Sequence, residues 1–317
     1  MPDLVPTIIV AAATGLVVAA LLFFVERGLA PRAWPFRPGA FAGPWAVGAG
    51  FAFAYRLALG AWPEFPATKA ADWLMWIACG LAIAAPLLQL RFVHSIIGPA
   101  VLGLLAAGAV TEWSLRNVMT NTLGAGARGA WVVGIAAAMT LACAAGALAL
   151  SATSRPTGGP RHSALVRLRD DHWGTFALGL MFAFAAPAVI FSSTIKLGQG
   201  MLGLGMAWAG VALVGLIFGL RLVGAGAAAI ALYGCLWCAT YFLADSSAMA
   251  LALAALAPLG LLIGFIPALR GRPWARFVLT SAAAGGLAAA SAGVLAPAYL
   301  GPEPEDEHAA VSGRPER

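Results

Sequence analysis

The chain has 317 residues, of which 61% are hydrophobic and only 10% are charged, and its formal net charge is +6. Soluble globular proteins carry about 25% charged residues, so this composition excludes an ordinary water-soluble domain and favours a protein whose apolar surface lies in a lipid bilayer. The positive charges are spread over separate short loops rather than gathered in one patch, so we expect no nucleic-acid partner.

About ten apolar stretches are long enough to cross a bilayer, which takes roughly 20 residues per α-helix. In chain order they are 5–25, 43–62, 72–90, 95–113, 129–151, 173–194, 201–220, 223–243, 247–268 and 277–298. We expect the first to be a retained helix rather than a signal peptide, because residues 1–3 contain no Lys or Arg and no clear cleavage site follows. The sequence therefore predicts an all-α polytopic membrane helix bundle of about ten transmembrane helices.

The Lys and Arg residues fall mainly on alternate loops. If the N-terminus lies outside, twelve of them lie in inner loops and six in outer segments, while Arg56 lies within a span. Inner loops of membrane proteins carry an excess of Lys and Arg. We therefore expect a multi-pass protein of a bacterial-type inner membrane with its N-terminus outside, and an odd helix count would move one end of the chain across.

One long internal loop divides the chain. Residues 152–172 begin with a Pro/Gly-rich stretch and continue with several Arg residues, so we expect a cytoplasmic linker. It separates an N-terminal membrane half, 1–151, from a C-terminal half, 173–300, each with about five helices. An odd number of helices per half would invert the second half, as in many secondary transporters, but this idea rests on the helix count alone. The acidic residues of 301–317 predict a disordered tail.

Two short motifs look functional but are better explained by packing. The glycines of 198–203 match G-x-G-x-x-G, yet a dinucleotide site needs a preceding strand, and this stretch lies between membrane-length helices. These glycines suit close helix packing instead. Cys235 and Cys238 form C-x-x-C inside an apolar span, and the four His residues are scattered along the chain. We therefore expect no metal, no cofactor, no catalytic residue and no enzymatic activity.

Tryptophans gather near the predicted ends of the spans. They predict an interfacial aromatic belt at the level of the lipid headgroups. These residues are Trp45, Trp62, Trp73, Trp113, Trp131, Trp173 and Trp274.

Four polar residues near the predicted outer side are candidates for a substrate path: Arg56, Glu112, Lys196 and Gln199. Arg56 follows apolar residues inside a span, so it either snorkels to the headgroups or faces a hydrated cavity. Lys196 and Gln199 follow Pro187, which can kink a membrane helix, and this pattern fits an ordinary helix end or a broken helix lining a path. Glu112 and Arg116 are spaced to pair on one helix face.

The leading hypothesis is a transporter or permease for a small molecule or an ion, with these four residues lining its polar path. The alternative is a non-catalytic scaffold or accessory subunit that packs against other membrane proteins, since abundant glycine and sparse intramembrane charge suit it equally well. The lipid bilayer is the expected environment in both cases. An intramembrane enzyme would need His, Asp or Glu clustered at one depth, and the sequence offers no such cluster.

Overall fold

The computed structural model describes residues 4–29, 40–90, 96–153, 172–192, 195–218, 222–244, 246–269 and 272–300. Most of the predicted linker and the whole acidic tail lie outside these ranges. The elements are α1 (Leu4–Leu29), α2 (Ala42–Leu59), α3 (Trp73–Leu87), α4 (Ile97–Ala109), the π-helix η1 (Val110–Ser114), α5 (Arg116–Thr122), α6 (Ala125–Thr153), α8 (Trp173–Phe191), α9 (Ile195–Phe218), α10 (Val223–Leu243), α11 (Ala248–Leu256), the 3-10 helices η2 (Ala257–Phe265) and η3 (Pro267–Leu269), and α12 (Pro273–Leu300).

Within the described ranges, eight helical stretches are long and apolar enough to cross a membrane. They are Leu4–Gly28, Ile97–Ser114, Ala125–Ser151, Trp173–Phe191, Ile195–Phe218, Val223–Leu243, Ala248–Phe265 and Pro273–Pro297. The other two predicted spans form α2, with 18 residues, and the shorter apolar helix α3, with 15 residues. The protein is therefore an all-α multi-pass membrane helix bundle, as the sequence predicts.

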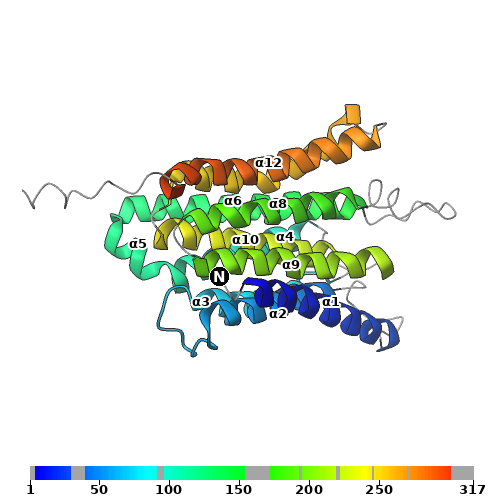
Figure 1. Cartoon of the computed structure of the whole chain (residues 1–317), viewed down its shortest axis with the longest axis horizontal. Coiled ribbons are helices and arrows are strands. Elements are labelled where there is room, and N and C mark those ends of the chain that lie inside the picture. Colours follow the sequence, from blue (N-terminus) through cyan, green and yellow to red (C-terminus); the bar gives the residue numbers. More distant parts are fainter. Residues whose placement is uncertain are drawn as a thin grey trace, which may run out of the picture.

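The helices run side by side along the longest axis of the molecule, with α12 at one edge and α1 to α3 at the opposite edge (Figure 1). Helix α10 forms the centre of the bundle. In its membrane-length apolar stretch 89% of the residues are buried, against 22% in that of α1. It packs against α2, α3, α4 and α6 from the first predicted half and against α8, α9 and α11 from the second. Helices on both sides of the linker thus build one core, and the division into two repeats stays a prediction.

Small residues let the helices approach closely where lipid supplies no hydrophobic force to press them together. A Cβ atom added at Gly15 of α1 would lie 2.6 Å from the backbone oxygen of Ala207 in α9. On α9, Gly198 meets Ile190 of α8, and Gly200 meets the ring of Tyr55 in α2. The expectation that the glycines of 198–203 serve helix packing is confirmed.

Described charged residues lie toward the two ends of the bundle. Glu26 and Arg27 end α1 at the same end where α12 begins, whereas α5 projects from the other end (Figure 1). The Glu26 carboxylate accepts hydrogen bonds from the backbone N–H groups of Phe41 and Ala42, at 2.7 and 3.1 Å. A carboxylate at a helix N-terminus is favourable for the helix dipole, so Glu26 fixes the start of α2 against the end of α1.

The ninth span changes helix type halfway. α11 continues directly into η2, a 3-10 helix of nine residues. A 3-10 helix rises about 2.0 Å per residue and an α-helix about 1.5 Å, so these 18 residues extend ~31 Å and match a hydrocarbon core of roughly 30 Å. Gly260 lies directly on α12, where an added Cβ would be 2.8 Å from the Ala284 nitrogen.

Candidate functional site

A folded loop, residues 60–72, covers the predicted outer end of the first helices. Three side chains from different helices bind its backbone oxygens: Tyr55 Oη of α2 donates to Ala71 at 3.0 Å, and Ser114 Oγ of η1 donates to Ala70 at 2.7 Å. The indole of Trp76 in α3 donates to Glu64 at 3.2 Å. These bonds satisfy backbone groups of a loop that has no regular structure and hold α2, α3 and η1 at fixed positions.

Arg56 lies in the last turn of α2 and is partly exposed. Its backbone oxygen accepts a hydrogen bond from Gly60, whose φ of +82° ends the helix in the left-handed conformation that glycine adopts most readily. A cation in the last helical turn interacts favourably with the helix dipole. This position, one turn from the helix end, fits the snorkelling interpretation of Arg56.

Lys196 and Gln199 lie one turn apart at the start of α9. Lys196 is exposed, whereas Gln199 is 8% exposed. Next to Gln199, Gly200 touches the ring of Tyr55, the residue before Arg56. The structure therefore brings the end of α2 and the start of α9 together, with Arg56 and Gln199 both near this junction.

Glu112 lies apart from that junction, on the π-helix η1. Its carboxylate is 3.8 Å from the Arg116 guanidinium, and the two side chains are 63% and 69% exposed. The predicted pairing of these two residues is therefore present, but an exposed ion pair of this kind contributes little to stability. Glu112 directs its charge to the surface rather than into the helix core.

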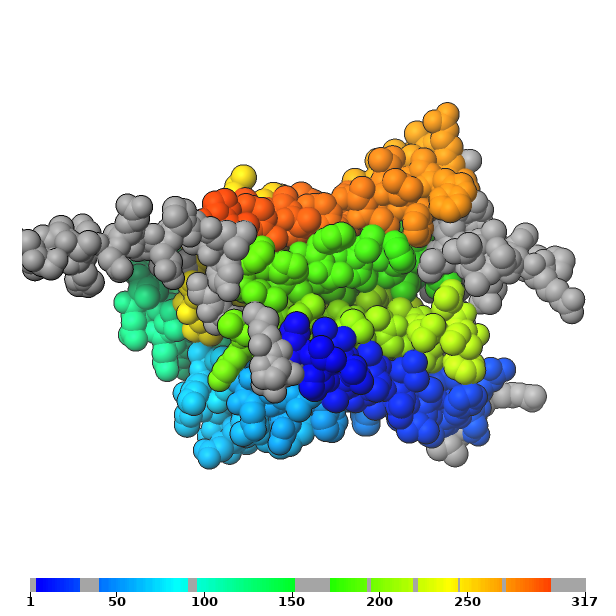
Figure 2. Space-filling view, viewed as in Figure 1, coloured from blue at the N-terminus to red at the C-terminus, as the bar shows by residue number. Residues whose placement is uncertain are grey.

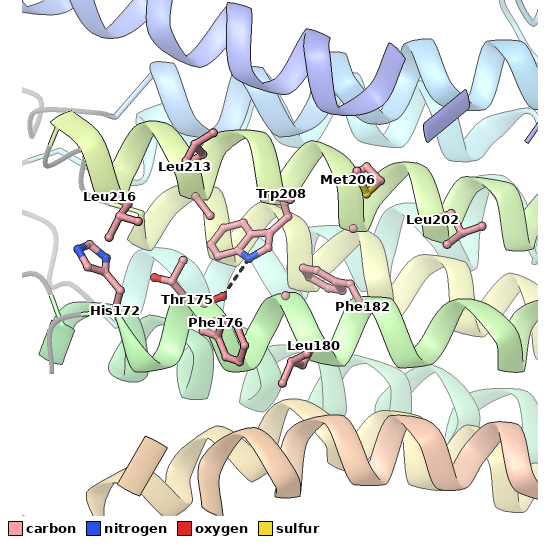
Figure 3. Close-up of a pocket in the computed structure, with 15 residues that line it drawn as sticks. His172, Thr175, Phe176, Leu180, Phe182, Leu202, Met206, Trp208, Leu213 and Leu216 are labelled. Carbon is pink, nitrogen blue, oxygen red and sulfur yellow. Dashed lines mark hydrogen bonds between the residues drawn. The ribbon is translucent and has the colours of Figure 1, made fainter. Parts of the chain in front are cut away.

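An apolar groove lies between α8 and α9. Its volume is about 430 Å³. Figure 3 shows it, with Trp208 and Phe182 between the two helices. The residues that line it are His172, Thr175, Phe176, Gly179, Leu180, Phe182, Ala183, Leu202, Gly205, Met206, Trp208, Ala209, Ala212, Leu213 and Leu216. The face that carries α8 and α9 is bounded by α12 on one side and α1 on the other (Figure 2).

The polar groups of this groove lie at the end where α8 begins. The indole nitrogen of Trp208 donates to the backbone oxygen of Thr175 at 3.2 Å. The Thr175 hydroxyl is buried and has no hydrogen-bond partner among the described residues. His172 is the residue just before α8 and also lines the groove. The groove therefore has an apolar body and one polar end.

The same two helices touch at their other ends. An added Cβ at Gly198 would overlap the Ile190 side chain and would lie 3.2 Å from the Ile190 Cα. At Gly179, inside the groove, the nearest atom to an added Cβ is on the Trp208 ring, 3.7 Å away. α8 and α9 are thus spread by Trp208 in one half and in close contact in the other half.

A second cavity, of about 250 Å³, lies between α6, α10 and α11. Its lining includes three large aromatic side chains, Trp131, Tyr233 and Trp237. Cys235 and Cys238 are buried in α10. The Cys235 thiol donates a weak hydrogen bond to the backbone oxygen of Ala106, 3.8 Å away. Among the described residues, no group of three His, Cys, Asp or Glu side chains could hold a metal ion.

These cavities were not predicted from the sequence, which directed attention to charged residues. Trp208 and Trp237 carry the signal that could have found them: a tryptophan in the middle of a span needs space between helices and a partner for its N–H group.

The chain matches no protein-family model, no curated protein and no solved structure. The geometry of the groove and the cavity is therefore the basis for a functional proposal.

Proposed function

We propose that the protein is a permease for a small amphipathic molecule, which occupies the α8–α9 groove on its way across the bilayer. The lining of the groove carries this proposal. Leucine, methionine and phenylalanine side chains would contact the apolar body of the molecule, and the end of the groove that carries His172 and Thr175 would lie beside its polar group. A volume of about 430 Å³ is in the range of ligand sites, ~300–1,000 Å³.

The lining also favours a small molecule over an ion as the substrate. An ion that leaves water must exchange its hydration shell for carbonyl or charged ligands. The groove presents mainly hydrocarbon, which is a poor substitute for water around a charge but a good environment for an apolar body. Of the two substrate classes that the sequence allows, the groove therefore supports the small molecule.

The different spacing of α8 and α9 along their length suggests how a permease of this kind would work. The groove is open in the half that contains Trp208, and the helices are in contact where Gly198 meets Ile190. Release on the other side would require that contact to separate. Pro187 lies one turn before Ile190 inside α8, and because proline lacks an N–H group it removes one helical hydrogen bond and lets α8 bend there. Lys196 and Gln199 would then face the released molecule.

The test is transport into proteoliposomes from a total extract of small molecules, with mass spectrometry identifying what accumulates. We expect one or more amphipathic compounds to accumulate several-fold over protein-free liposomes. Gly179→Leu fills the groove and should abolish that accumulation. The matched control is Gly286→Leu in α12, where an added Cβ meets nothing within 4 Å. Equal accumulation by wild type, Gly179→Leu and protein-free liposomes would refute the proposal.

A second candidate function is that of a scaffold, and the α5–α6 hairpin favours it. Residues 124–130 are all exposed, and the hairpin is held by a hydrogen bond of 3.0 Å from Arg128 Nη1 to Thr120 Oγ1. An exposed, basic hairpin at one end of the bundle would suit a protein partner. Purification in a mild detergent distinguishes the two functions, because a scaffold should carry a stoichiometric partner that Arg128→Glu releases.

A further inference from the structure

The α8–α9 groove is long enough for one extended acyl chain. His172 and Leu216 lie at one end of it, and Leu202 lies toward the other end (Figure 3). Leu202 and Leu216 are 14 residues apart in α9. At about 1.5 Å per residue this is a distance of ~21 Å, and one leaflet of the hydrocarbon core is ~15 Å thick. The groove can therefore hold the whole chain of a single-chain lipid.

Arginine residues at the start of α12 stand where α8 begins. Phe277 of α12 stacks on Phe176, which lines the groove, with ring centroids 5.0 Å apart. The Arg276 guanidinium lies over the ring of Trp173, the first residue of α8, 5.5 Å from the ring centroid. Arg272 lies one turn earlier, where its backbone oxygen accepts from the Arg276 N–H at 3.0 Å, and its side chain is exposed.

α1 places a further arginine at this end, beside α9. Phe23 and Phe24 of α1 pack against Phe218, the last residue of α9, with ring centroids 5.7 and 5.3 Å apart. The Arg27 guanidinium lies over the Phe23 ring, 5.9 Å from its centroid, and the Arg27 side chain is exposed. Leu216, two residues before Phe218, lines the groove. Arginine side chains from α12 and α1 therefore flank this end of the groove on both sides.

The described charges at this end favour an anionic ligand. Neither Arg27 nor Arg272 forms an ion pair with another described residue. Glu26 is the one carboxylate that the described residues place here, and it accepts hydrogen bonds from the N–H groups of Phe41 and Ala42. An apolar groove that ends at a positively charged membrane interface suits a molecule with a hydrocarbon chain and an anionic head group.

We propose that the α8–α9 groove binds a long-chain carboxylate, whose chain lies along the two helices and whose head group faces Arg27 and Arg272. This inference deepens the proposed function and rests on it for the place of the substrate. It adds the sign of the charge on the substrate, which the apolar lining alone does not determine.

The first experiment measures binding to the full chain in nanodiscs of phosphatidylcholine, a lipid without net charge, and empty nanodiscs correct for partition into lipid. Radiolabelled palmitate, ionised at alkaline pH, is compared with cetyl alcohol, which has the same number of carbons and no charge. Gly179→Leu fills the groove, and Gly286→Leu is the matched control in α12. We expect saturable binding of palmitate, stronger than that of cetyl alcohol, which Gly179→Leu abolishes and Gly286→Leu leaves unchanged.

The second experiment tests the head group. The double variant Arg27→Gln, Arg272→Gln removes two cations beside the groove, and the control Arg116→Gln, Arg128→Gln removes the same charge from the opposite end of the bundle (Figure 1). One exposed ion pair strengthens binding about two- to fivefold. The first double variant should therefore lower the preference for palmitate over cetyl alcohol about tenfold, whereas the control should keep it. All four side chains are exposed, so this comparison decides the matter even if Gly179→Leu does not fold.

The inference is overturned if the wild type binds palmitate no better than cetyl alcohol, or if folded Gly179→Leu binds palmitate as the wild type does. Full preference for palmitate in the Arg27→Gln, Arg272→Gln variant overturns it as well. The permease proposal can fail separately. If Gly179→Leu abolishes the accumulation of neutral or cationic compounds only, the permease stands and the anionic substrate is wrong. If palmitate binds in the groove but proteoliposomes accumulate no compound, the binding site stands and the permease is wrong.

Discussion

The indole nitrogen of Trp208 donates a hydrogen bond to the backbone oxygen of Thr175, 3.2 Å away, and so joins α9 to α8 across the groove (Figure 3). The Trp208 ring also packs edge-on against Phe182, with ring centroids 6.3 Å apart. Trp208 is therefore a spacer: its volume keeps the two helices apart in one half of the bundle, while its N–H group fixes how far apart they are.

Replacing Trp208 should destabilise the bundle in two steps. Trp208→Phe removes the hydrogen bond and part of the ring, and we expect a loss of about 1–2 kcal/mol in the free energy of unfolding. Trp208→Ala leaves a cavity in the core and should cost about 3–5 kcal/mol. Thermal unfolding in detergent measures both. Trp62→Phe, a change at a side chain that is 50% exposed, is the control and should have little effect.

Gly198 should tolerate no side chain while Ile190 stays in place. An added Cβ would overlap Ile190, so Gly198→Val should cost about 1–3 kcal/mol or shift α8 away from α9. Shortening the opposing side chain in the double variant Gly198→Val, Ile190→Ala should recover part of the loss, which a double-mutant cycle measures. At Gly286, where nothing lies within 4 Å, alanine should be neutral or stabilising by ~0.5–1 kcal/mol. Equal effects at the two glycines would contradict this account of the α8–α9 contact.

The sequence predicts the membrane helices well because their signal is long and strong. Each span is a run of apolar residues close to bilayer length, and the close-packing role of Gly198, Gly200 and Gly203 follows from the small-residue rule. Which helices become neighbours is a different question. The contact of α9 with both α1 and α2, for example, depends on shape matching between faces that look alike in composition.

The tryptophans show the same limit at single residues. Trp45, Trp62, Trp113 and Trp274 are 42–60% exposed and fit the predicted aromatic belt. The prediction is wrong for Trp173, which also stands at a helix start but is only 2% exposed. The Arg276 guanidinium lies over the Trp173 ring, 5.5 Å from the ring centroid. Gly264, which has no side chain, leaves space for the far edge of that ring. Both partners lie about 90–100 residues further along the chain, beyond the reach of a local pattern.

The predicted polar path can be tested once a transported compound is known. If Arg56 and Lys196 line the path, Arg56→Ala and Lys196→Ala should each lower flux in proteoliposomes by about tenfold, the cost of one lost charge-assisted hydrogen bond. Glu112→Ala should leave flux unchanged, because the exposed Glu112 side chain pairs with Arg116 at the surface. Unchanged flux in correctly inserted Arg56 and Lys196 variants would remove both residues from the mechanism and leave only structural roles at the helix ends.

The predicted orientation follows from the charges of alternate loops and can be checked with single cysteines. The four native cysteines lie within helices, three of them buried, so added surface cysteines can be labelled selectively once the partly exposed Cys79 is replaced by alanine. A membrane-impermeant maleimide applied to intact cells should label Leu123→Cys, between α5 and α6, but not Gly158→Cys in the linker. Inverted vesicles should give the opposite result. Labelling of Gly158→Cys in intact cells would place the basic linker outside, against the positive-inside rule, and would reverse the side toward which the α8–α9 groove opens.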